Sequence, residues 1–179
     1  MIFFQLYTRL FMQASTILPL SITAYIIRKG NASFEYLILR RCSKHLFGNW
    51  QPVTGNIETH ETAWQAALRE IQEETQLQPS RFYVAEVVEV FYELYLNAVV
   101  TVPVFVAFVD DFQEVITEPK EHDAFEWVSY EKALTILNFA EHKRSMKTVH
   151  ESFVEQQPNE MLRIYFSKST VLETSANIL

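Results

Sequence analysis

The sequence contains a single cysteine, Cys42, among its 179 residues. No intramolecular disulfide can form, and we expect a reducing, cytoplasmic setting. Positive charge is also scarce: the sequence has 15 Lys and Arg against 22 Asp and Glu, which gives a formal net charge of −7. Proteins that bind a nucleic-acid polymer through its backbone need clustered Lys and Arg, so this class of partner is excluded. A small nucleotide is not excluded, since a bound divalent cation supplies positive charge locally.

Uncharged residues run from Leu10 to Ile27, which is long enough to raise the question of a membrane span. Polar residues interrupt this stretch, and from Leu18 onwards its apolar residues alternate, as they do in a strand. Only Arg9 could serve as the basic start of a secretory signal. We therefore expect neither a membrane partner nor export.

Hydrophobic patterning predicts one domain of mixed strands and helices, of the α/β or α+β class. Strands are expected over residues 17–28, 36–42, 50–57, 82–96, 98–110 and 124–128, and helices over 62–75, 130–137 and 143–154. Residues 161–167 are expected to add a further strand.

The helix predicted over residues 62–75 has an unusual acidic face. Glu70, Glu73 and Glu74 lie at helical spacing, so their like charges point the same way and repel. Such a row is often only a solvated surface. This helix, however, begins with a capping-box pattern at Thr62, and an apolar row fixes its other side in a core. A divalent cation among the carboxylates would give the row a purpose, and Mg²⁺ held in this way usually reaches substrate phosphates.

This segment resembles the signature of the Nudix family. Gly55, five residues, Glu61, seven residues and then Arg69-Glu70-Ile71-Gln72-Glu73-Glu74-Thr75-Gln76-Leu77 match eight of the nine specified positions, and Gln76 replaces the family's Gly. A Gly at a helix end usually adopts the left-handed conformation, which costs Gln roughly 1 kcal/mol. The resemblance implies an α/β/α sandwich with a mixed sheet.

The similarity covers roughly residues 17–154, and around residues 50–55 and 121–127 it points to the dihydroneopterin triphosphate (dATP) pyrophosphatase branch. We accordingly divide the chain into a non-core N-terminal extension (1–11), a Nudix domain (12–155) and a C-terminal extension (156–179).

The resemblance also assigns roles to individual residues. It implies Mg²⁺, with Mn²⁺ as an alternative, bound by four carboxylates: Glu70, Glu73, Glu74 and Glu121. Glu73, Glu74 and Glu121 would also take part in catalysis, together with Arg69, which we expect to orient carboxylates through Glu61 or Glu73. Glu61 is expected to be structural, and His122 to form scaffold hydrogen bonds.

Substrate contacts are expected near the Gly55 loop. Arg40 and Arg41 close a strand, and alternation places them on opposite faces, so we expect at most one of them to meet the substrate. The resemblance to the subgroup implies that Arg40 is the phosphate contact. Thr54 and Gly55 are further predicted substrate contacts. Aromatic candidates for stacking on a base or pterin, although residues of this kind more often belong to a core, are Trp50, Phe91, Tyr92 and Tyr95.

The sequence thus predicts a Mg²⁺-dependent pyrophosphohydrolase that converts a nucleoside triphosphate or dihydroneopterin triphosphate into the monophosphate and pyrophosphate. A Nudix hydrolase of a nucleoside diphosphate derivative, such as ADP-ribose or a dinucleoside polyphosphate, is the second reading. A nucleotide-sensing domain without turnover is the third.

Overall fold

The structure is a computed structural model and describes residues 17–44, 46–110 and 112–167. Within these ranges the strands are β1 (Ser21–Lys29), β2 (Phe34–Arg41), β3 (Trp50–Gln51), β4 (Val53–Asn56), β5 (Arg81–Glu93), β6 (Ala98–Val109) and β7 (His122–Val128). The helices are α2 (Ala63–Thr75), α3 (Tyr130–Ile136) and α4 (Ala140–His150), followed by a π-helical turn, Glu151–Glu155, and a 3-10 turn, Glu160–Leu162. The N-terminal extension predicted over residues 1–11 lies outside the described residues.

The described strands form one mixed sheet arranged around β1. Its order is β3-β2-β1-β6-β5, while β4 pairs with β1 and β7 pairs with β2. Only β1 and β6 run parallel. Strand β1 pairs with β4 over residues 21–24 and with β2 over residues 27–29, so two different strands share the same edge of β1. Strand β7 lies along β2, with His122 opposite Arg41.

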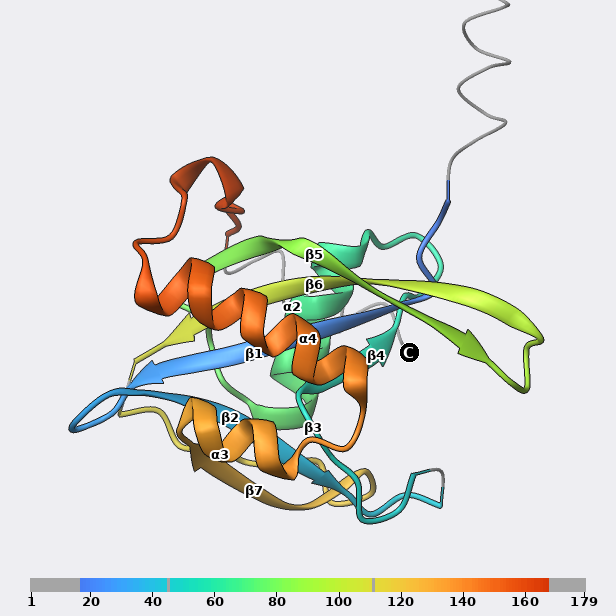
Figure 1. Cartoon of the computed structure of the whole chain (residues 1–179), viewed down its shortest axis with the longest axis horizontal. Coiled ribbons are helices and arrows are strands. Elements are labelled where there is room, and N and C mark those ends of the chain that lie inside the picture. Colours follow the sequence, from blue (N-terminus) through green and yellow to red (C-terminus); the bar gives the residue numbers. More distant parts are fainter. Residues whose placement is uncertain (1–16, 45, 111, 168–179) are drawn as a thin grey trace, which may run out of the picture.

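Helices cover both faces of this sheet, α2 on one side and α3 with α4 on the other (Figure 1). Alternation along β2 supplies both cores: Leu37 and Leu39 pack with α2, whereas Tyr36 and Ile38 pack with α3 and α4. The three-layer α/β/α sandwich with a mixed sheet is therefore confirmed.

Helix α2 forms where local sequence signals place it. The backbone N–H of Thr62 donates to Oε1 of Gln65 at 2.9 Å, which provides the predicted N-terminal cap. At the other end Gln76 adopts the left-handed conformation, with φ of 57°, and its N–H donates to the carbonyl of Gln72. Gln76 thus ends the helix in the conformation for which Gly is usually selected.

Three predicted elements differ from the structure. The single strand expected over residues 50–57 is two short strands separated at Pro52, which has no N–H to donate to a ladder. The last helix begins at Ala140 rather than at residue 143 and continues into the π-helical turn. The strand expected over residues 161–167 is wrong: the chain there forms the 3-10 turn and a single bridge between Arg163 and Tyr83.

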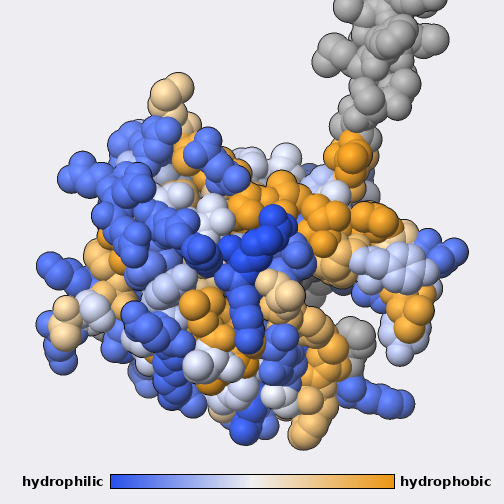
Figure 2. Space-filling model, viewed as in Figure 1, coloured by the Kyte–Doolittle hydropathy of each residue, from blue (hydrophilic) through white to orange (hydrophobic). Residues whose placement is uncertain are grey.

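The β5–β6 hairpin carries an exposed apolar surface, which extends to the right in Figure 2. Tyr95, at its tip, is 85% exposed, and Tyr92 is also exposed. Trp50 instead packs against the core beneath α3 and α4. Among the described helices, none has the combination of length and apolar character needed to span a membrane.

Candidate metal and active site

Arg69 organises the acidic face of α2, with a side chain that is only 3% exposed. Its Nη1 donates to Glu70 at 2.8 Å and to Glu73 at 2.9 Å, while Nη2 and Nε donate to Glu61 at 2.7 and 3.2 Å. A further bond reaches the carbonyl of Asn56 at 2.9 Å. Burial opposes its charge, but the hydrogen bonds that it donates to Glu61 and the charge of Glu70 raise the pKa of Arg69 above its ordinary value. The guanidinium therefore holds three carboxylates in place.

Glu61 fits the structural role expected of it. Its side chain is buried against Arg69 and also accepts a hydrogen bond from the backbone N–H of Glu58 at 2.7 Å. Burial alone would raise its pKa, but the bond from Arg69 reverses this and lowers the pKa of Glu61. The residue ties the loop before α2 to the helix.

Gly55 and Glu70 are in direct contact. A Cβ atom on Gly55 would lie 2.0 Å from the carboxyl group of Glu70, far inside van der Waals contact. Burial raises the pKa of Glu70 to about 7, an effect that Arg69 opposes and that Glu73 and Glu121 reinforce. The absence of a side chain at residue 55 is what allows Glu70 its position in the structure.

Glu74 is the most deeply buried carboxylate of α2, at 2% exposure. Neither of its oxygens has a hydrogen-bond partner among the described residues. Burial, reinforced by Glu70 and Glu121, raises its pKa well above the ordinary value, while Arg41 works in the opposite direction. A buried carboxylate without a partner is costly, so the site calls for a positive charge.

His122 lies beside Glu74 and is 1% exposed. Burial and the charge of Arg41 lower its pKa to about 4. The scaffold hydrogen bonds expected of His122 are absent, because neither ring nitrogen has a partner in the described part of the chain. Glu121 ends the preceding loop, and its side chain is 47% exposed. One ligand atom each from Glu74, Glu121 and His122 lie within 4.8 Å of one another.

These donors fit a divalent cation. A carboxylate oxygen of Glu74 from α2 and one of Glu121 from the loop before β7 lie close together, and the neutral imidazole of His122 lies beside them. A cation there would satisfy the unpartnered oxygens of Glu74. Of the four predicted ligands, Glu74 and Glu121 belong to this compact group, whereas Glu70 and Glu73 are held beside it by Arg69.

The structure places Arg41, rather than Arg40, beside the acidic cluster. Nη2 of Arg41 lies 3.9 Å from Glu121. Arg40 is exposed, donates to both oxygens of Asp123 at 2.8 and 3.0 Å and lies over the Trp50 ring. The two arginines lie on opposite faces of β2, as alternation predicts. Which of them lies beside the acidic cluster depends on how β7 pairs with β2. The sequence did contain a signal for the face of Arg41. Leu37 and Leu39 precede it at two-residue spacing, so all three side chains share the face of β2 that packs with α2.

Thr54, a predicted substrate contact, is part of a hydrogen-bond chain on β3 and β4. Its hydroxyl accepts from Nε2 of Gln51 at 2.8 Å, and Oε1 of Gln51 accepts from Asn49 at 2.9 Å. Both amide residues are buried. This chain holds the strand segment that leads into the Gly55 loop.

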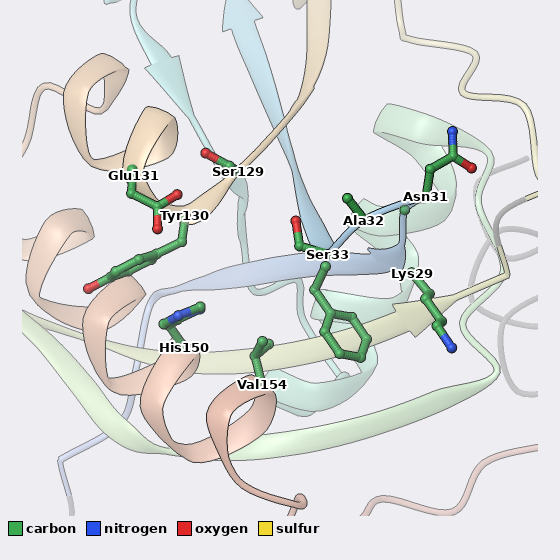
Figure 3. A pocket seen from close by; sticks show the side chains of 11 residues that line it. Lys29, Asn31, Ala32, Ser33, Ser129, Tyr130, Glu131, His150 and Val154 are labelled. Carbon is green, nitrogen blue, oxygen red and sulfur yellow. The ribbon is translucent and has the colours of Figure 1, made fainter.

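A separate cavity of about 330 Å³ lies away from the acidic cluster. Figure 3 shows Tyr130 and His150 on one side of it and the turn between β1 and β2 on the other. The two rings stack on each other with centroids 3.8 Å apart. Phe34 in its wall begins β2, whereas Arg41 ends it, so about 3.3 Å per residue puts roughly 23 Å between them.

Comparison with known proteins agrees with this geometry. The model of the NUDIX domain matches residues 18–169. The asymmetrical bis(5'-nucleosyl)-tetraphosphatase of Rattus norvegicus is 29% identical over 131 residues, which cover 70% of this chain and 85% of that protein.

Two solved structures share the fold. A C. elegans Ap4A hydrolase in a binary complex has a TM-score of 0.63 and 23% identity, and covers 75% of this chain and 96% of its own. The E. coli dihydroneopterin triphosphate pyrophosphohydrolase has a TM-score of 0.59 and 23% identity, with 78% and 99% covered. The chain belongs to the Nudix family, and it is a Nudix hydrolase that acts on phosphoanhydrides.

These comparisons show the family but not the subgroup that the sequence predicts. The curated relatives matched in rat, mouse and pig are all asymmetrical tetraphosphatases, so the similarity does not single out the dihydroneopterin triphosphate branch.

Proposed function

We propose that this protein hydrolyses a dinucleoside polyphosphate, using a divalent cation and cutting the phosphate chain asymmetrically. The observation that carries this proposal is the similarity to the rat tetraphosphatase, which extends over 85% of that protein. For a chain of four phosphates, asymmetric hydrolysis leaves one product with three phosphates and the other with one. The substrate that was the second reading of the sequence thus becomes the first candidate.

The acidic site supports the same chemistry. A bound Mg²⁺ would supply charge neutralisation for the phosphates and lower the pKa of a water molecule. We assign its binding to Glu74 and Glu121, with Glu70 and Glu73 completing the acidic surface. Arg69 keeps Glu70 and Glu73 oriented through its hydrogen bonds.

Other residues of this chain have proposed roles towards water and phosphate. The side chain of Glu121 is half exposed, and its carboxylate is placed to accept a proton from the attacking water. Arg41 is within reach of the same space and would donate hydrogen bonds to the phosphate chain. Thr54, Gly55 and Arg40 remain proposed substrate contacts, and Arg40 would have to exchange Asp123 for the substrate.

A triphosphate is the second candidate substrate, because the E. coli dihydroneopterin triphosphate enzyme shares the fold. The two candidates differ in their products. A nucleoside triphosphate cut between its α and β phosphates releases pyrophosphate, whereas asymmetric cleavage of a dinucleoside tetraphosphate releases no pyrophosphate.

The test is a substrate panel with purified full-length protein and Mg²⁺. Diadenosine tetraphosphate, dATP, dihydroneopterin triphosphate and ADP-ribose are compared by kcat/KM, and products are separated by ion-exchange chromatography. We expect diadenosine tetraphosphate to be preferred and to yield ATP and AMP in equal amounts. A higher kcat/KM for either triphosphate, with pyrophosphate released, would replace the first candidate by the second.

The matched control for the acidic site is Glu86→Gln. Glu86 is an exposed glutamate on β5 and is not part of the cluster, so its loss should leave turnover unchanged. Glu121→Gln removes the same charge from the site and should lower kcat by roughly two decades or more. Equal turnover of the two variants would remove Glu121 from the proposed mechanism.

A further inference from the structure

We propose that His122 is a nitrogen ligand of the catalytic cation, so that the centre is a mixed nitrogen–oxygen site rather than an all-carboxylate one. The inference rests on the proposed function only in requiring that a divalent cation binds at Glu74 and Glu121. It adds a ligand to that site and a preference among metals.

The first support is that His122 has no other role among the described residues. An imidazole has two ring nitrogens that both need hydrogen-bond partners, yet neither nitrogen of His122 has one. The side chain is almost completely buried, so bulk water does not compensate for the missing partners. A buried polar group left in this state is costly.

The second support is that Glu74 lies beside His122 in the same condition. Both carboxylate oxygens of Glu74 are buried and unpartnered, and no hydrogen bond joins them to the imidazole. One ligand atom each from Glu74, Glu121 and His122 lie within 4.8 Å of one another. Ligands of a small divalent cation stand about 2.0–2.2 Å from it, so two opposite ligands are roughly 4.2 Å apart. The three atoms therefore lie close enough together for one cation to reach them.

The third support is the origin of the three residues. Glu74 comes from the last turn of α2, while Glu121 and His122 come from the chain segment that enters β7. The pairing of His122 with Arg41 on β2 fixes the backbone at this point. The imidazole is thus held by the sheet, and the carboxylate of Glu74 by the packed helix, which is the rigid placement that a metal centre needs.

An imidazole ligand changes which cation is favoured. Imidazole suits Zn²⁺ and the later transition metals, whereas oxygen ligands and water suit Mg²⁺. We therefore expect removal of His122 to weaken Zn²⁺ far more than Mg²⁺. An all-carboxylate centre would show no such difference.

The experiment uses metal-depleted, full-length protein loaded with Mn²⁺ as a paramagnetic probe. Electron spin echo envelope modulation detects a directly bound imidazole nitrogen, without substrate and without turnover. The wild-type protein should show this nitrogen modulation, and His122→Asn should lose it. Absence of nitrogen modulation in the wild type, with Mn²⁺ bound, would overturn the proposal without the need for any variant.

Calorimetric titration supplies the second readout. In His122→Asn, the Zn²⁺ dissociation constant should rise roughly ten- to a hundredfold, while that of Mg²⁺ changes less than about threefold. Equal losses for both metals would contradict nitrogen ligation. His142→Asn is the matched control, because His142 also has a buried, unpartnered ring nitrogen but belongs to α4 and lies near Glu89. It should retain the modulation and both affinities.

Failure of this inference is distinguishable from failure of the proposed function. Hydrolysis of diadenosine tetraphosphate without nitrogen modulation would leave the function standing and remove His122 from the metal. Nitrogen modulation in a protein that hydrolyses none of the four panel substrates would retain the ligand and overturn the function.

Discussion

Burial of Glu74 carries a large free-energy cost, since its carboxylate is enclosed at the end of α2 without a hydrogen-bond partner among the described residues. Its raised pKa expresses that cost, of which burial is the first cause. Such a group stabilises the folded chain only when a cation accompanies it. Function and stability of the metal-free protein therefore oppose each other at this position.

Glu74→Gln should lower kcat by roughly two decades or more, because it removes one charge from the metal centre. The same change should raise the free energy of unfolding of the metal-free protein by about 1–2 kcal/mol at pH 7, since a neutral amide is less costly to bury than a carboxylate. Urea denaturation in the presence of a chelator measures the second effect. A variant with wild-type turnover would remove Glu74 from the ligand set.

Arg41 and Arg40 provide a comparison of two adjacent side chains with different surroundings. Arg41→Ala should lower kcat/KM ten- to a hundredfold, because a charge-assisted hydrogen bond to phosphate contributes roughly 1.5–3 kcal/mol. Arg40→Ala should have a smaller effect, since Arg40 is occupied with Asp123. If Arg40→Ala had the larger effect in steady-state kinetics, the assignment made from the sequence would hold.

Gly55 has no side chain, and the Glu70 carboxyl group occupies the space that a Cβ atom would fill. Gly55→Ala should displace the Glu70 carboxyl and lower both kcat and Mg²⁺ affinity by roughly tenfold or more. Gly48→Ala is the control, because Gly48 has open space around it but a φ of +77°. It should lower the melting temperature and leave Mg²⁺ affinity unchanged. Isothermal titration and thermal melting together separate the two outcomes.

At the scale of elements, α2 combines strong local signals with one unfavourable position. Its cap, its apolar row and its acidic row all lie within a short stretch of sequence, and the structure has the helix where they predict it. Gln76 is the exception, since it holds a left-handed conformation that glycine adopts without strain.

Gln76→Gly should stabilise the protein by roughly 1 kcal/mol and raise the melting temperature by about 2–4 °C. Turnover should stay the same, because Gln76 lies beyond the acidic row. Asn97→Gly is a matched control at the β5–β6 turn, where φ is 50°. Asn tolerates this conformation better than Gln does, so its replacement should stabilise less. Thermal melts in which Gln76→Gly destabilises the chain would contradict the cap interpretation.

At the scale of the whole molecule, the acidic site joins two distant parts of the chain. Helix α2 lies on one face of the sheet, and β7 forms its far edge beside β2. A cation bound by Glu74 and Glu121 would cross-link these parts. Binding of Mg²⁺ should therefore stabilise the entire domain and not only one helix.

Saturating Mg²⁺ should raise the free energy of unfolding by about 2.7 kcal/mol at a concentration one hundred times the dissociation constant. Differential scanning calorimetry with increasing Mg²⁺ measures this rise. In Glu74→Gln the rise should be much smaller at the same concentrations, whereas Glu86→Gln should retain it. A melting temperature that is independent of Mg²⁺ in the wild-type protein would mean that the folded state does not bind the ion.

The amino-acid sequence by itself determined the features that depend on spacing along a few turns of helix. These are the position of α2, its capping residue, the shared direction of Glu70 and Glu73, and the hydrogen bond of Arg69 to Glu73. Local periodicity decides them, because residues three and four apart on a helix always share a face.

Only the tertiary structure decided which distant side chains meet those carboxylates. The burial of His122 beside Glu74 and the position of Arg41 beside Glu121 depend on the pairing of β7 with β2, and no local pattern encodes that register. Contacts between residues far apart in the chain arise only when the sheet closes, and these contacts place Glu121 and His122 beside the acidic helix.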